Sequence, residues 1–112
     1  MNLPEIFKKM PDSAIPQKLS WLFWSYDIKS MDLNADKDYI IQQVLNYGTW
    51  DDVGWLKKTY PEKEIREVVK NPSRGVWFDD VLNFWTTIFD IRLPHRVREK
   101  ALFRLVPWEQ PR

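Results

Sequence analysis

The sequence predicts an all-α protein, a single compact domain of five to six short helices with a central, aromatic-rich helix. Apolar residues recur at intervals of three and four between the eight prolines and three glycines, which is the periodicity of helices. No segment alternates clearly between apolar and polar residues, although 90–93 could form a short strand. The 112 residues suffice for one core, which seven Trp, six Phe and four Tyr can fill. We therefore treat 1–112 as one helical domain, with 1–15 and 107–112 less ordered.

The first half of the chain is expected to form three helices. Pro4 can open a short one, and a second follows Pro16. After an irregular segment over 25–35, polar residues suited to an N-cap precede a clear helix over 36–47, which Gly48 ends. The side chains that we assign to the core from this half are Leu19, Leu22, Phe23, Trp24, Ile28, Met31, Leu33, Ile40, Ile41, Val44 and Leu45.

The second half contains the helix that we expect to be central. The run 49–52 (TWDD) resembles a capping box with Asp in place of Glu, and it predicts a helix over 50–60. A helix over 62–70 follows, and 71–75 is the strongest turn signal in the chain. Because 77–90 is apolar on most of its circumference, we expect it to lie at the centre of the fold. The side chains assigned to the core are Val53, Leu56, Tyr60, Ile65, Val68, Val69, Leu82, Phe84 and Trp85.

The composition excludes several classes of function. The chain has no Cys, which removes disulfides, zinc–thiolate sites and thiol nucleophiles. The glycines, Gly48, Gly54 and Gly75, do not have the spacing of a Walker or dinucleotide-binding fingerprint. A net charge of +1 gives no overall field that would attract nucleic acid. No apolar run has the length of a signal peptide or a membrane span, so we expect a cytoplasmic protein without membrane contact. We also expect no cofactor.

Three groups of polar residues resemble functional sites but fail on spacing. The run 32–38 has the oxygen ligands that open an EF-hand loop, but the Gly and Glu that complete the loop are missing. The acidic pairs at 51–52 and 79–80 cannot act together, because adjacent residues on a helix do not face each other. His95, the only histidine, accompanies no nucleophile motif. We therefore expect no metal site and no catalytic residue.

The last segment carries a basic stripe, in which a positive residue recurs at every fourth position over 92–104. On a helix these side chains would share one face, opposite an apolar one. The stripe has three possible interpretations: a solvated face, a surface for an acidic protein partner, or a contact with nucleic acid phosphates. Its residues are Arg92, Arg96, Lys100 and Arg104.

The helices predicted over 50–60 and 62–70 could also form a helix-turn-helix. The protein would then be a DNA-binding regulator whose second helix contacts a DNA groove. The polar face of that helix mixes three basic with three acidic residues, which suits phosphates poorly. A DNA-binding regulator is therefore the alternative function.

Four short runs together resemble a family of small uncharacterised bacterial proteins. They are 22–27 (LFWSYD), 39–45 (YIIQQVL), 64–69 (EIREVV) and 82–85 (LNFW). The family shares an FWxYD, IIxxVL, IREVV, LNFW pattern, and its members are often encoded beside nucleotidyltransferase-like toxins of the abortive-infection type. The resemblance covers roughly 19–93, and it implies an antitoxin-like or accessory partner without catalytic residues.

We therefore expect a non-enzymatic interaction protein that binds a protein partner through an aromatic patch with the basic stripe at its rim. The resemblance implies that this partner is a nucleotidyltransferase-like toxin, and surplus aromatic surface would also allow homo-oligomers. Asn83 lies between apolar neighbours, either on an exposed strip or hydrogen-bonded to a buried group. The predicted partner-binding residues are Trp50, Trp55, Trp77, Arg92, Arg96, Lys100, Arg104 and Trp108.

Overall fold

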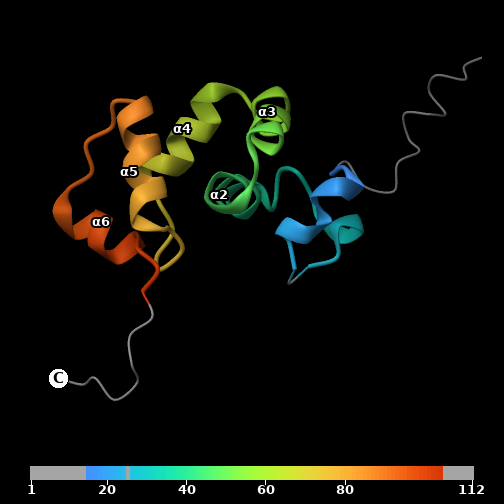
Figure 1. The fold of residues 1–112 in the computed structure, drawn as a ribbon, viewed down its shortest axis with the longest axis horizontal. Helices are drawn as coiled ribbons and strands as arrows, with labels where there is room; N and C mark the ends of the chain where they lie inside the picture. The colour runs from blue at the N-terminus through green and yellow to red at the C-terminus, as the bar shows by residue number, and fades with distance from the viewer. Residues whose placement is uncertain (1–14, 25, 105–112) are drawn as a thin grey trace, which may run out of the picture.

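Helices make up the regular structure of the protein in the computed structural model, which describes residues 15–24 and 26–104 (Figure 1). No strand forms in this part of the chain, which has one isolated parallel bridge between Trp77 and Leu102. The all-α prediction is therefore confirmed. The elements are the 3₁₀ helices η1 (Gln17–Leu22) and η2 (Ile28–Ser30) and the α-helices α2 (Lys37–Tyr47), α3 (Trp50–Thr59), α4 (Glu62–Lys70), α5 (Asp79–Ile88) and α6 (His95–Ala101).

The local signals in the sequence predict most of these elements well. The helices predicted over 36–47, 50–60 and 62–70 form with bounds that differ by at most one residue. The segment after Pro16 folds as the short 3₁₀ helix η1, and 90–93 is not a strand. The helix predicted after Pro4 lies outside the described residues.

The central helix of the fold is α2, which contacts η1, α3, α4 and α5 (Figure 1). Its residues 40–46 are all buried. We expected 77–90 to take this place, but α5 buries only Leu82, Trp85 and Thr86. Its principal packing neighbours are α2 and α4, and they leave its apolar side chains Phe84 and Ile88 exposed. An apolar circumference therefore did not predict the central position here.

Three buried amide side chains connect α2 to other parts of the chain. Gln43 Nε2 donates to the carbonyl oxygen of Leu22 (2.7 Å) in η1. Asn46 Oδ1 accepts from the backbone N–H of Phe78 (3.2 Å), the residue that precedes α5. Gln42 bonds to the 73–77 segment through both atoms of its amide. Because a buried amide costs free energy unless it is paired, these bonds favour one arrangement of the surrounding elements.

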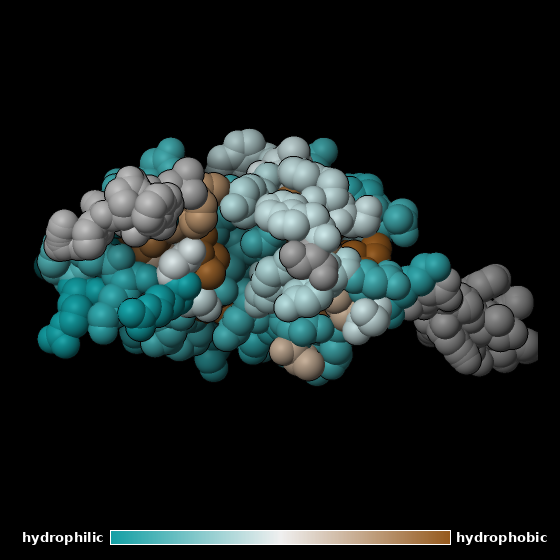
Figure 2. Space-filling view, turned by 90° about the horizontal axis from the view of Figure 1, so that it is seen from below, coloured by the Kyte–Doolittle hydropathy of each residue, from teal (hydrophilic) through white to brown (hydrophobic). Residues whose placement is uncertain are grey.

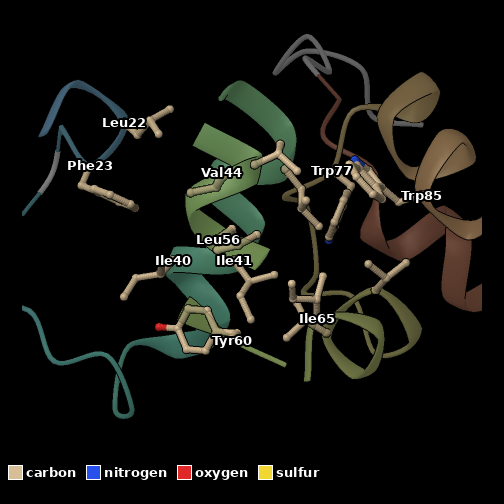
Figure 3. Packing of buried hydrophobic residues seen from close by; sticks show 14 of the residues in the cluster. Leu22, Phe23, Ile40, Ile41, Val44, Leu56, Tyr60, Ile65, Trp77 and Trp85 are labelled. Atoms are coloured by element: carbon tan, nitrogen blue, oxygen red, sulfur yellow. The ribbon is translucent and has the colours of Figure 1, made fainter. Parts of the chain in front are cut away.

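Trp77 occupies the space between α2 and α5 (Figure 3). The side chain is fully buried, and its Nε1–H donates to Gln42 Oε1 (2.8 Å). Its backbone pairs with the end of α6, since its N–H donates to the Ala101 oxygen (2.9 Å) and its oxygen accepts from the Phe103 N–H (2.7 Å). Contacts with residues more than twenty positions away thus bury this indole.

A capping box and a close backbone approach at Gly48 form the sharp connection between α2 and α3. The predicted capping box forms: Thr49 Oγ1 accepts from the Asp52 N–H (3.2 Å), and Asp52 Oδ2 accepts from the Thr49 N–H (2.9 Å). Gly48 has an ordinary φ of −76°, so it is not needed for a left-handed turn. A Cβ on Gly48 would instead lie 2.7 Å from the carbonyl oxygen of Val44. The site requires glycine because no side chain fits there.

Candidate protein-binding surface

An open groove with aromatic walls lies between the start of α3 and α5, over the end of α2. Its volume is about 540 Å³. Trp50 and Val53 line it from α3, and Phe84 and Trp85 line it from α5. We call this site the aromatic groove, and its lining residues are Leu45, Asn46, Gly48, Thr49, Trp50, Val53, Asp80, Val81, Phe84 and Trp85.

The rings of the aromatic groove pack against one another and still face solvent. Phe84 and Trp85 meet edge to face with their centroids 5.0 Å apart, and Trp50 lies 5.8 Å from Phe84. Trp50 is nevertheless 69% exposed and Phe84 is 43% exposed, while Trp85 is buried below them. Edge-to-face pairs of this kind hold rings in fixed orientations. These contacts favour the observed ring orientations in the absence of a partner.

A second hollow of about 330 Å³ continues the apolar surface along α5. It shares Leu45, Val53 and Trp85 with the aromatic groove. Ile88, which is 56% exposed, and Phe89, which stacks on Trp85 at 5.8 Å, extend it toward the end of the helix. The two hollows together give α5 a long, uncovered apolar side.

Most polar side chains in and beside the aromatic groove form hydrogen bonds within the protein. Asn46 bonds to the N–H of Phe78, and Thr49 and Asp52 cap α3, which leaves Asp80 as the charged side chain that lines the groove. General acid–base chemistry needs a proton donor or acceptor within reach of a second reacting group. The groove offers apolar contact and shape rather than such a pair.

Two tyrosines have shifted pKa values, and both lie outside the groove. Burial, followed by the nearby carboxylates of Glu64, Asp32 and Asp36, raises the pKa of Tyr60 to about 12. Burial also raises the pKa of Tyr39. The Tyr60 hydroxyl donates to the carbonyl oxygen of Leu33 (2.7 Å), which requires the protonated form. Both groups are structural phenols at neutral pH.

The acidic run 32–38 forms a turn that satisfies its own backbone. Asp36 Oδ2 accepts from the Asp32 N–H (2.8 Å), and the Asp32 carboxylate accepts from the N–H groups of Asn34 and Ala35 (3.3 Å each). Within 15–24 and 26–104 no group of three or more His, Asp or Glu side chains is placed to hold a metal ion. No helix in the same ranges is long and apolar enough to cross a membrane.

The predicted tryptophans separate into three kinds. Trp50 forms a wall of the aromatic groove, a position compatible with its predicted role in binding a partner. Trp55 is partly buried against the core and does not line the groove. The prediction for Trp77 is wrong, because this indole is fully buried and its N–H is bonded to Gln42. Trp108 lies outside the described residues.

The basic stripe does not form a single helical face. Helix α6 has only seven residues, so Arg92 precedes it and Arg104 follows it. Arg104 Nη2 bonds to Glu99 Oε1 (2.8 Å), and Arg98 bonds to the carboxylate of Asp79. None of the residues of the stripe lines the aromatic groove. The prediction that the stripe borders the aromatic patch is therefore not supported, although its side chains are exposed.

Two residues that we assigned to the core lie on the surface instead. Phe84 belongs to the aromatic groove, and Trp24 is 61% exposed. Trp24 begins a row of edge-to-face aromatic contacts that passes through Tyr47 and Phe78 to Phe103. Figure 2 shows pale side chains gathered over the N-terminal 3₁₀ helices, with strongly apolar residues visible only in small areas. Asn83 is also exposed, which agrees with the first of its two predicted placements.

Part of the chain is similar to a known protein family. No curated protein and no solved structure matches the chain. The family match ends before α5, so it includes the α3 wall of the aromatic groove but not the α5 wall. Residues 19–69 match DUF6922, a family of unknown function.

Proposed function

We propose that this protein is a non-enzymatic interaction protein that binds an apolar segment of a protein partner in the aromatic groove. The observation that carries the proposal is the exposure of Trp50, Phe84 and Ile88 side by side along one open surface of α3 and α5. Neighbouring large apolar side chains on a surface are typical of a protein interface.

The energetics favour a protein segment as the occupant. Covering a large exposed apolar side chain stabilises a complex by about 1.5–3 kcal/mol when burial is complete. Aromatic side chains in the middle of an interface are the residues that most often dominate binding. The aromatic groove is open, and the mutual contacts of its rings favour one arrangement of them. A binding segment would therefore meet a preformed surface that loses little entropy when it binds.

The partner that we propose is a nucleotidyltransferase-like toxin, with this chain as its antitoxin-like partner. The support for this part is the resemblance of the four runs at 22–27, 39–45, 64–69 and 82–85 to a family encoded beside such toxins. The chain lacks the Gly-Ser and paired-Asp signature of a nucleotidyltransferase, so we assign it the binding role and not the transfer reaction.

A DNA-binding regulator is less well supported. Helices α3 and α4 form the expected pair, but the exposed side chains of α4 are Glu62, Lys63, Glu67 and Lys70, two of each sign. Phosphate contacts require an excess of cations on the helix that faces DNA. The mixed charge of α4 disfavours a recognition helix.

Co-expression tests the proposal directly. The protein would be produced with an affinity-tagged nucleotidyltransferase encoded beside its gene, and the complex would be isolated through the tag. We expect a stoichiometric complex with the wild-type chain and its loss with a Trp50→Ala, Phe84→Ala double variant. Trp24→Ala is the control, because Trp24 is 61% exposed, close to the 69% of Trp50, but lies outside the groove. Failure of the wild-type protein to co-purify would reject this partner, and equal retention of all variants would reject the groove.

A further inference from the structure

A separate hollow with a basic rim lies between the end of α4 and the segment that leads into α6. Its volume is about 450 Å³. Lys70 and Arg92 contribute a cation each, and the apolar side chains between them are Pro72, Leu93, Pro94 and Val97. We call this site the basic hollow. It shares no lining residue with the aromatic groove, so the inference does not depend on the proposed function.

The two cations of the basic hollow are not neutralised by the fold. Neither Lys70 nor Arg92 forms an ion pair or side-chain hydrogen bond within the described ranges, whereas Arg98 and Arg104 both bond to carboxylates. No Asp or Glu is among the residues that line the hollow. A ligand that enters it therefore meets uncompensated positive charge on two sides.

More cations approach the hollow from neighbouring segments. Arg96 precedes Val97 on α6 and is exposed. The N–H of Gly75 donates to the carbonyl oxygen of Lys100 (2.9 Å), which brings the backbone around Arg74 against the end of α6. The acidic side chain on the adjoining turn of α4, Glu67, accepts a hydrogen bond from Asn71 Nδ2 (3.1 Å). The cations named around the hollow, Lys70, Arg74, Arg92 and Arg96, therefore outnumber the one carboxylate on the adjoining turn of α4.

The apolar side chains that line the basic hollow favour some anionic ligands over others. An acidic peptide offers carboxylates, which arginine binds through two parallel hydrogen bonds. It also offers apolar side chains between the carboxylates, which the apolar residues of the hollow can cover. Single-stranded nucleic acid is usually held by aromatic rings under its bases, and none lines this hollow. The two prolines in the lining restrict the backbone at positions 72 and 94. We propose that the basic hollow binds an acidic segment of a partner protein, with an apolar side chain seated between two carboxylates.

A titration of the full chain followed by proton–nitrogen correlation NMR tests this proposal. The probe is a capped peptide of sequence Asp-Glu-Leu-Glu-Asp, compared with its neutral analogue Asn-Gln-Leu-Gln-Asn and with a duplex DNA oligonucleotide at the same salt concentration. We expect saturable shifts of the amides around Lys70, Arg92 and Val97 with the acidic peptide only. The double variant Lys70→Gln, Arg92→Gln should weaken binding by about tenfold or more.

Lys18→Gln, Lys58→Gln is the matched control, because it removes the same charge from exposed residues outside the lining. We expect it to weaken binding less than twofold to threefold, as screened charges at a distance should. Equal weakening by both double variants would show a diffuse charge effect and overturn the proposal. Stronger binding of the duplex DNA with the same shifted amides would assign the hollow to nucleic acid. An absence of saturable shifts with the acidic peptide would also overturn it.

Discussion

Gln42 and Trp77 share a hydrogen bond in the centre of the fold, from the indole Nε1–H to the amide Oε1 at 2.8 Å. The same oxygen accepts from the backbone N–H of Ser73 (2.8 Å), and Gln42 Nε2 donates to the Ser73 hydroxyl (3.0 Å) and the Asp38 oxygen (3.1 Å). The amide therefore uses all its bonding capacity. This contact joins α2 to the chain that leads into α5 and so sets one wall of the aromatic groove.

Replacing Gln42 with Met should destabilise the protein although the side-chain volume changes little. The variant leaves the buried indole N–H of Trp77 and the N–H of Ser73 without acceptors, which costs about 2–4 kcal/mol in the free energy of unfolding. Urea unfolding followed by circular dichroism measures the change. In a double-mutant cycle with Trp77→Phe, the double variant should lose less unfolding free energy than the two single variants lose together. The reason is that Trp77→Phe removes the indole N–H that Gln42→Met leaves without an acceptor. Simple additivity would contradict the account.

Two glycines should respond in opposite ways to replacement by Ala. Gly48→Ala places a Cβ 2.7 Å from the Val44 oxygen, so we expect a loss of about 1–3 kcal/mol. Gly54 lies inside α3 with nothing within 4 Å of its Cβ position, so Gly54→Ala should stabilise by about 0.5–1 kcal/mol. Thermal unfolding of the two variants at one pH gives both signs. Stabilisation by Gly48→Ala would contradict the observed packing between α2 and α3.

Stability should fall between pH 10 and pH 12 because of Tyr60. The folded state raises the pKa of this phenol from an ordinary value of 10.0 to about 12, so it favours the protonated form. The resulting contribution is fully present below pH 10 and is lost as the pH rises through 12, a change of roughly 3 kcal/mol. Urea midpoints measured at intervals across this range give the slope. Since other groups titrate there too, Tyr60→Phe is the control, and an equally steep fall in that variant would assign the effect elsewhere.

The helices could be predicted because the signals that define each one, its apolar spacing and its capping residues, lie within a short stretch of sequence. The apolar spacing of Ile40, Ile41, Val44 and Leu45 identifies α2, and the capping run at 49–52 identifies the start of α3. The burial of Gln42 could not be predicted in this way. Its partners are 31 and 35 residues away, and a glutamine in a helix normally faces solvent.

The composition of the aromatic groove depends on which faces remain uncovered after folding. Trp77 is fully buried and its backbone pairs with residues 101–103, whereas Phe84 stays 43% exposed on a side of α5 that no helix of the described residues covers. Both residues belong to the same apolar stretch, so periodicity alone treats them alike. Periodicity assigns Phe84 to the core for this reason, and it assigns Trp24 to the core beside Leu22 and Phe23. An excess of aromatic residues indicated that some would be exposed, but tertiary contacts decide which.

Calorimetric titration of the proposed nucleotidyltransferase partner into three single variants tests the central claim most directly. If the aromatic groove is the binding surface, Trp50→Ala and Phe84→Ala should each weaken binding by about thirtyfold, and Trp24→Ala should change it less than about threefold. The heat capacity change of binding should be negative for the wild-type chain, because apolar surface is covered. Unchanged affinity in the groove variants, or a larger loss in Trp24→Ala, would contradict the account.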